Sequence, residues 1–284
     1  MAPVTEEPYT YALADGLALR MYPDRRPGNL EIAGIHKALV LLRGGVELVE
    51  EGAGLGLPIA KYGDKTYFPG SATLTILPGK PTVAVKTYVM DSISVKSLGD
   101  GRISDLIYHP LHRAFSHMYL RLGALRGVFD TVIELRGVAG VRTSFEPAEP
   151  RGEVEVTYVF RPDRVEIRAR TGLREGCEEL IVLNEQGAST FRRYSDAGQT
   201  LMDGKIGAWD TVEGAEATLS GLDGAPSFTV ERPPGTSLWR GRESIRGRLS
   251  WAGLALSFRG FGEVAYTIRV ANSPSRVTLA AKSH

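Results

Sequence analysis

Hydrophobic and polar residues alternate along most of this chain, which is the pattern of half-buried β-strands. The longest alternation covers residues 81–98. At about 3.3 Å per residue it predicts a strand far longer than the usual five or six residues, with a bulge near Asp91. The clearest hairpin pattern joins segments 153–160 and 164–170 through a turn at 162–163, and its charged positions predict a solvent-exposed face.

Shorter apolar segments separated by Gly, Pro and Asp predict the remaining strands, at 17–22, 38–42, 46–49, 131–135, 141–145, 180–183, 190–194, 217–219, 228–230, 245–251, 254–258 and 264–270. Segment 17–22 is predicted to be an edge strand, and Gly253 a turn. The pair Gly44-Gly45 predicts a tight hairpin, with a helix over 35–42 as the alternative. The pattern gives about fifteen strands. The sequence contains no repeat of fixed period, which argues against a propeller or solenoid.

One segment, 103–137, departs from this pattern because its apolar residues recur at spacings of four and three. They form a single stripe, made by Leu111, Phe115, Met118, Leu122, Leu125 and Phe129. The stripe predicts one long helix, over about 104–129, that docks on a sheet. Three of the five histidines of the chain, His109, His112 and His117, lie away from the stripe on that helix.

The many strands, the very long strand and the single helix together resemble the large β-sandwiches of the galactose mutarotase-like superfamily. The resemblance implies a mainly β fold, a large antiparallel β-sandwich (supersandwich-like) with one long inserted helix. It covers residues 1–284 as a single domain, with the proline- and glycine-containing segment 147–152 as the candidate boundary for a subdivision. No Asn-His pair precedes an aromatic strand, as in the sugar-binding pattern of that family, so no catalytic residue is carried over.

Charge and composition exclude several classes of function. The net charge of +1 gives no general attraction to nucleic acid or to an anionic membrane surface. Cys177 is the only cysteine, so no intrachain disulfide can form, and no apolar run approaches the roughly 18 residues of a membrane span. We therefore expect a soluble, cytoplasmic protein. Asn and Gln are scarce, which is typical of a thermophile.

The histidines and a carboxylate pair are the candidates for acid–base chemistry. Imidazole titrates near neutral pH, so His109 or His112 can act as acid or base, with Glu50 or Glu51 beside a glycine-rich loop as the partner. The simpler interpretation is a polar helix surface and two solvated carboxylates at a strand end. No metal site is predicted, since His117 lies too far round the helix to join the other two histidines. No cofactor is predicted either.

Aromatic and basic residues of the second half suggest the ligand. Trp209, Trp239, Arg240 and Arg242 are the residue types that stack on sugar rings and bond to hydroxyl or carboxylate groups. The sequence thus favours a carbohydrate-active or carbohydrate-binding protein that uses a cleft beside the 104–129 helix, with acid–base chemistry on a sugar or polysaccharide. The alternative is a non-enzymatic β-sandwich scaffold that binds a protein or lipid partner through its Trp and Arg loops. The sequence carries no signal of oligomeric state.

Overall fold

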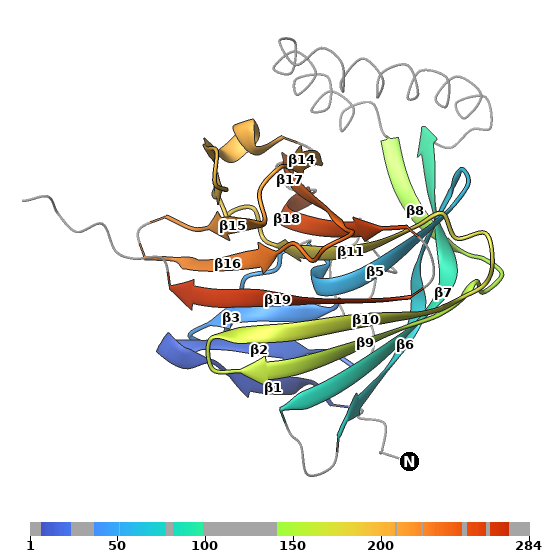
Figure 1. The fold of residues 1–284 in the computed structure, drawn as a ribbon, viewed down its shortest axis with the longest axis horizontal. Coiled ribbons are helices and arrows are strands. Elements are labelled where there is room, and N and C mark those ends of the chain that lie inside the picture. The colour runs from blue at the N-terminus through green and yellow to red at the C-terminus, as the bar shows by residue number, and fades with distance from the viewer. Residues whose placement is uncertain are drawn as a thin grey trace, which may run out of the picture.

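The fold is mainly β, as predicted. The computed structural model of the chain describes residues 7–23, 37–50, 52–77, 82–98, 141–207, 209–222, 224–245, 249–259 and 262–272. These residues form nineteen strands and two short 3₁₀ helices, η1 (Ala14–Gly16) and η4 (Asp203–Ile206). All strand pairs are antiparallel and belong to one continuous sheet, which is drawn in Figure 1.

The first half of this sheet has the strand order β1-β2-β3-β5-β11-β18-β17-β14, with β4 on the end of β3. Its strands are β1 (Tyr9–Ala12), β2 (Leu17–Met21), β3 (Leu39–Arg43), β4 (Val46–Glu47), β5 (Gly54–Tyr62), β11 (Glu179–Gln186), β14 (Asp210–Val212), β17 (Ser237–Ile245) and β18 (Leu249–Phe258). β11 thus lies between β5 and β18, in the middle of the half.

The second half has the order β6-β7-β9-β10-β19-β16-β15-β12-β13, with β8 beside the C-terminal part of β7. Its strands are β6 (Lys65–Ile76), β7 (Val83–Leu98), β8 (Val141–Pro147), β9 (Gly152–Arg161), β10 (Arg164–Leu173), β12 (Arg193–Ser195), β13 (Thr200–Met202), β15 (Glu216–Ser220), β16 (Pro226–Glu231) and β19 (Glu263–Asn272). The β5–β6 hairpin joins the two halves.

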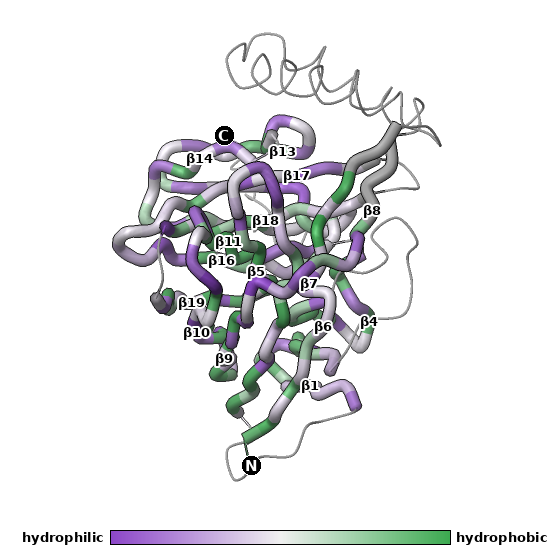
Figure 2. Tube along the Cα trace, turned by 90° about the vertical axis from the view of Figure 1, so that its right-hand side faces the viewer, coloured by the Kyte–Doolittle hydropathy of each residue, from purple (hydrophilic) through white to green (hydrophobic). Residues whose placement is uncertain are grey.

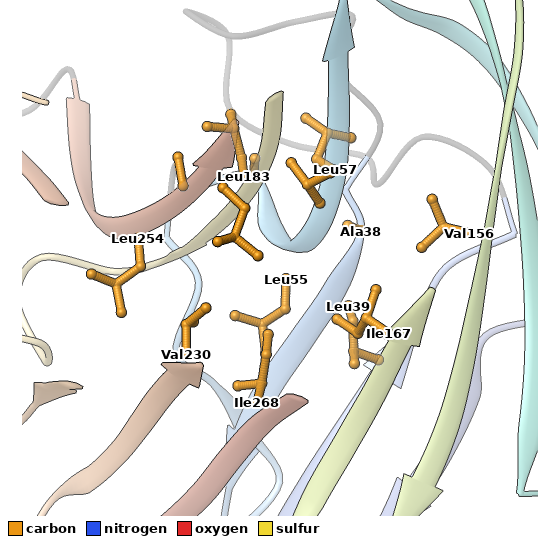
Figure 3. Packing of buried hydrophobic residues seen from close by; sticks show 14 of the residues in the cluster. Ala38, Leu39, Leu55, Leu57, Val156, Ile167, Leu183, Val230, Leu254 and Ile268 are labelled. Carbon is orange, nitrogen blue, oxygen red and sulfur yellow. The ribbon is translucent and has the colours of Figure 1, made fainter. Parts of the chain in front are cut away.

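The hydrophobic core lies between the two halves. Leu55 and Leu254 from the first half face Val230 and Ile268 from the second, as Figure 3 shows. All four side chains are fully buried. Since each half presents one apolar face to the other, packing them together removes both faces from water, and this is the main force that stabilises such a fold.

The alternating pattern predicted β7 and the β9–β10 hairpin, whereas β6, the second longest strand, was not predicted. The hairpin β9–β10 has the predicted turn, and its apolar positions are buried while the charged positions between them face solvent. β7 extends over 16 residues, and its pairing with β6 shifts register around Asp91 and Pro69, where the bulge was predicted. The tube in Figure 2 changes repeatedly between hydrophobic and hydrophilic along such strands.

Local glycine signals misled the prediction in the last third of the chain. Gly253 is no turn but the middle of β18, and the predicted strand 245–251 is divided between β17 and β18. Most of β17 was missed, because Trp239, Arg240 and Arg242 resemble a loop in composition. β2 is not an edge strand, since β1 pairs with its outer side.

The remaining predictions have mixed outcomes. The hairpin at Gly44-Gly45 is present, so the alternative helix over 35–42 is wrong where residues 39–42 form β3. Segment 190–194 is a strand only from Arg193. The predicted helix over 104–129 and the strand 131–135 lie outside the described residues.

A bulge in β5 brings its backbone against the second half of the sheet. The pairing of β5 with β11 shifts register after Leu183, and Gly56 is the extra residue, with φ +89°. A Cβ atom at Gly56 would lie 2.6 Å from the hydroxyl oxygen of Tyr158, which is fully buried. Glycine is therefore needed here both for the backbone conformation and for the close approach.

We predict that Gly56→Ala destabilises the protein far more than Gly63→Ala. Both residues have left-handed φ, which costs alanine about 1 kcal/mol, but nothing lies within 4 Å of a Cβ atom at Gly63. Gly56→Ala must also displace a buried tyrosine, for about 1–3 kcal/mol more. Urea unfolding of the two variants measures the difference. Equal losses of unfolding free energy would contradict the close contact with Tyr158.

Candidate functional site

Three consecutive polar residues, Asn184, Glu185 and Gln186, are buried in the middle of the sheet at the end of β11. Gln186 accepts a hydrogen bond from the backbone N–H of Leu41 (3.2 Å) and donates to the carbonyl of Leu39 (3.4 Å). Asn184 accepts from the N–H of Gly56 (3.1 Å). The two amides point into the core, so alternation puts Glu185 on the opposite face of the sheet.

The carboxyl group of Glu185 is in an environment that favours its protonated form. Only 8% of the residue is exposed, and burial raises its pKa to about 7. The N–H of Ala53, which donates to Oε2 at 3.0 Å, and the positive charge of Lys37 both lower this pKa, whereas Glu243 raises it. Near neutral pH the group is therefore present in both protonation states, as a general acid or base requires.

Two glycines lie beside Glu185 on its face of the sheet, and neighbouring side chains pack directly on their backbone. Glu185 pairs with Gly253, and Gly253 pairs with Gly241 on the next strand. A Cβ atom at Gly253 would lie 2.5 Å from Cγ of Glu185. One at Gly241 would lie 2.9 Å from the ring of Trp209 and 3.0 Å from that of Trp251. The glycines thus make room for the glutamate on one side and for two indole rings on the other.

All three tryptophans of the chain lie on this face. Trp209 and Trp251 stack with their ring centroids 4.8 Å apart and an interplanar angle of 13°. Trp239 alternates with Gly241 on the same side of β17, and its Nε1 donates to Ser257 at 2.9 Å. Trp209 and Trp239 are half-buried, and Trp251 is buried. We call this surface the tryptophan face, made by Trp209, Trp239, Trp251, Glu185, Gly241 and Gly253.

Backbone strain gathers around residues 241–242 of β17, with Trp209 on the tryptophan face and with Glu50 and Asp203 beside Arg242, whose side chain alternates to the opposite side of the strand. Only four non-glycine residues of the described part of the chain have left-handed φ, and three of them, Glu50, Asp203 and Trp209, surround residues 241–242. The ring of Trp209 lies against Gly241, a carboxylate oxygen of Asp203 lies 3.5 Å from Arg242, and the charge of Glu50 acts on Arg242. Such conformations cost about 1–3 kcal/mol each and cluster at functional sites.

Glu50, one of the predicted acid–base partners, is bound within the protein. Its carboxylate accepts hydrogen bonds from the hydroxyls of Ser189 and Ser250, and it packs so closely on Gly187 that a Cβ atom there would lie 2.6 Å from its Cδ. The two hydroxyls join Glu50 to the segment that follows β11, through Ser189, and to the start of β18, through Ser250. Glu50 is therefore half-buried and hydrogen-bonded within the protein, and its predicted acid–base role stays a prediction.

Arg240, predicted to bind a ligand, uses its nitrogens on the neighbouring loop. Its Nε donates to the carbonyl of Ile206 and its Nη1 to that of Thr211, both at 3.1 Å. Its Nη2 lies 3.3 Å from the carboxylate of Asp210, and its Cζ is 5.1 Å from the ring centroid of Tyr194. Arg240 is buried, with 7% of the residue exposed, and it holds Ile206, Asp210 and Thr211, which flank Trp209 in the sequence.

Arg242 is the second predicted ligand-binding arginine. Its Nη2 donates to the carbonyl of Ala188 at 3.2 Å, and burial lowers its pKa below the ordinary value for arginine. Its Nε is buried and has no hydrogen-bond partner among the described residues. The roles predicted for Arg240, Arg242, Trp209 and Trp239 in ligand binding stay predictions.

The other predicted catalytic residues, His109, His112 and Glu51, lie outside the described residues, as does the cleft beside the 104–129 helix. Within the described ranges, no three His, Cys, Asp or Glu side chains are grouped so as to hold a metal ion. No helix in those ranges is long and apolar enough to cross a membrane.

Glu185 is the site residue that the sequence analysis missed. A partial signal was present, because three polar residues follow the apolar segment 180–183 and no glycine or proline occurs before Gly187. Reading them as the continuation of a central strand would have marked them as buried and therefore in need of partners.

No protein family model and no curated protein matches the chain. Among solved structures it is similar to a heparan sulfate lyase from Pedobacter heparinus, with 9% identity and a TM-score of 0.44 over 90% of this chain and 33% of the lyase. It is similar to a putative aldose 1-epimerase from Escherichia coli K12, with 9% identity and a TM-score of 0.43 over 94% of this chain and 100% of that one. A galactose mutarotase-like protein from Lactobacillus casei has 8% identity and a TM-score of 0.40, over 94% and 100%. Galactose mutarotase-like proteins are thus among the similar structures, as the resemblance seen in the sequence led us to expect.

We predict that Glu185→Gln changes how stability depends on pH. The native protein holds the Glu185 proton up to about pH 7, whereas the unfolded chain releases it near the ordinary pKa of 4.5. The stabilisation from the buried neutral group is therefore complete below about pH 4.5 and is lost as the pH rises to about 7. A shift of this size corresponds to about 3 kcal/mol, which the glutamine variant should keep at high pH.

Urea unfolding of both proteins between pH 4 and 8 measures this difference. From pH 4 to pH 8, the unfolding free energy of the variant should rise by about 3 kcal/mol relative to that of the wild type. Parallel pH dependences for the two proteins would show that folding does not raise the pKa of Glu185, and the assignment of an acid–base group would be wrong.

Proposed function

We propose that this protein binds carbohydrate at the tryptophan face and that Glu185 exchanges a proton with the bound sugar. One observation carries the proposal: a buried carboxyl group with a pKa of about 7 shares its sheet face with every tryptophan of the chain. The similar structures named above carry no weight in it.

Each part of this face has a role that suits a sugar. The faces of indole rings stack on the apolar C–H faces of pyranose rings, and the half-buried rings of Trp209 and Trp239 leave part of their surface for such contact. The side chain of Glu185 approaches Gly253, which pairs with Gly241 on the adjacent strand, so it lies about one strand spacing, or roughly 5 Å, from the rings beside Gly241. A sugar ring bridges a distance of that order and would present a hydroxyl to the carboxyl group.

The chemistry is reversible proton transfer. A carboxyl group that is half ionised near neutral pH takes a proton from a sugar hydroxyl in one direction and returns it in the other. Lys37, whose charge favours the ionised form of Glu185, and Glu243, whose charge opposes it, balance the group between its two states. The predicted acid–base residues His109 and His112 belong to the same proposal as the second proton carrier.

Sugar binding should be visible in the tryptophan fluorescence of the protein, because all three fluorophores lie on the proposed face. We predict that neutral sugars or uronic acids change this emission and raise the melting temperature. Trp209→Ala and Trp239→Ala should each weaken binding about tenfold, or about 1.4 kcal/mol. Phe68→Ala is the matched control, since it removes a half-buried aromatic ring on β6, outside the face. Equal weakening by all three changes, or no response to any sugar, would favour the non-enzymatic scaffold.

Catalysis is tested separately from binding. With a sugar that binds, we predict that the protein accelerates its anomeric interconversion, followed by polarimetry, and that Glu185→Gln lowers the rate at least about 100-fold while binding is retained. His112→Ala should lower the rate without a change in melting temperature if His112 is the second proton carrier. Full activity of Glu185→Gln would remove Glu185 from the chemistry and leave only the binding part of the proposal.

A further inference from the structure

A second site lies on the other side of loop 187–190, away from Glu185. A surface pocket of about 440 Å³ opens there between the end of β3 and the start of β12. Its polar lining consists of Arg43, Arg192, Ser189 and Thr190, and part of its apolar lining is Leu222 and Pro226. We call it the arginine pocket. None of its lining residues was singled out by the sequence.

The two arginines differ in how firmly they are held. Arg192 forms a two-pronged ion pair with Asp203, in which Nε and Nη2 each donate at 2.9 Å. This fixes the guanidinium plane and leaves the Nη1 hydrogens free of Asp203. Arg43 is exposed, and its guanidinium forms no ion pair with any residue in the described ranges. One cation is therefore preset, and the other can move to meet a ligand.

The charges around the pocket favour an anion. Its lining holds two cations and no carboxylate. The nearest carboxylates behind it are already engaged: Asp203 by Arg192 and Arg242, and Glu50 by the hydroxyls of Ser189 and Ser250. The guanidinium of Arg43 and the Nη1 group of Arg192 are the donors that remain for the oxygens of a carboxylate, sulfate or phosphate group.

An apolar wall completes the pocket. Leu222 is 38% exposed, one of three large hydrophobic residues that are so exposed in the described part of the chain. Such a residue next to two cations suits a ligand with an apolar body and an anionic end.

From this geometry we infer that the arginine pocket binds small organic oxyanions, with the carboxylate, sulfate or phosphate group between Arg43 and Arg192 and the apolar part against Leu222. The inference is independent of carbohydrate binding at the tryptophan face.

Isothermal titration calorimetry of the full chain in a phosphate-free buffer tests the inference. The probes are benzoate, phenyl phosphate and the neutral benzyl alcohol. We expect both anions to bind with dissociation constants in roughly the millimolar range, more weakly at high salt, and benzyl alcohol to bind at least about tenfold more weakly. Tighter binding of phenyl phosphate identifies a phosphate-type site, and tighter binding of benzoate a carboxylate site.

Three variants locate the binding. Arg43→Gln removes an exposed side chain without an ion pair in the described structure, so it should fold normally and weaken anion binding at least about tenfold. Arg192→Gln should also weaken anion binding at least about tenfold. Arg193→Gln is the control, because Arg193 is its exposed neighbour and does not line the pocket. Unchanged binding in Arg43→Gln, or equal binding of benzyl alcohol and benzoate, would overturn the inference.

Discussion

The way in which the two halves of the sheet pack depends on hydrogen bonds to the backbone N–H and C=O groups of Gly56. Asn184 of β11 accepts a hydrogen bond from its N–H, while the hydroxyl of Tyr158 on β9 lies 3.2 Å from its carbonyl oxygen. Tyr266 of β19 donates to the same oxygen of Asn184, at 2.8 Å. Burial holds the pKa of both tyrosines well above the ordinary value, so their hydroxyls stay protonated and able to donate. An unpaired polar group at this depth would cost about 1–3 kcal/mol, so these bonds fix how the two apolar faces meet.

The sequence predicted those parts of the fold in which the side-chain pattern follows directly from burial. β9 and β10 have one apolar and one polar face, and their alternation identified them. Alternation also identified β7, but its fully buried side chains, Lys86 among them, lie opposite to the half-buried Val83 and Val85 of the pattern. Alternation did not identify β17 and β18 correctly, because Gly241 and Gly253 in these strands leave room for side chains from elsewhere in the chain. A glycine that makes room for a partner far away in the chain cannot be distinguished from a turn glycine by its neighbours in sequence. Of the candidate site, the tryptophans were predicted, whereas the burial of Glu185 depends on β5 and β18, on either side of its strand.

The tryptophan face contains two departures from the usual rules of folding, because a glutamate is buried there and a tryptophan adopts left-handed φ. Each departure costs stability. Others lie outside this face, where Lys86 is fully buried and Nε of Arg242 and Oδ1 of Asn272 are buried without a hydrogen-bond partner in the described residues. Proteins concentrate such departures where a ligand has to be met by groups already held in position.

The place of β11 between β5 and β18 also has a consequence during synthesis on the ribosome. β5 ends at Tyr62, but the strand that pairs along its length begins only at Glu179. At a synthesis rate of about 5–20 residues per second, on the order of ten seconds pass between the synthesis of β5 and that of β11, its pairing partner. For that time an apolar strand presents unpaired N–H and C=O groups, which is the condition for pairing with another nascent chain. Yield of the folded protein in a cell should therefore be governed by translation speed and chaperones acting before residue 179 emerges.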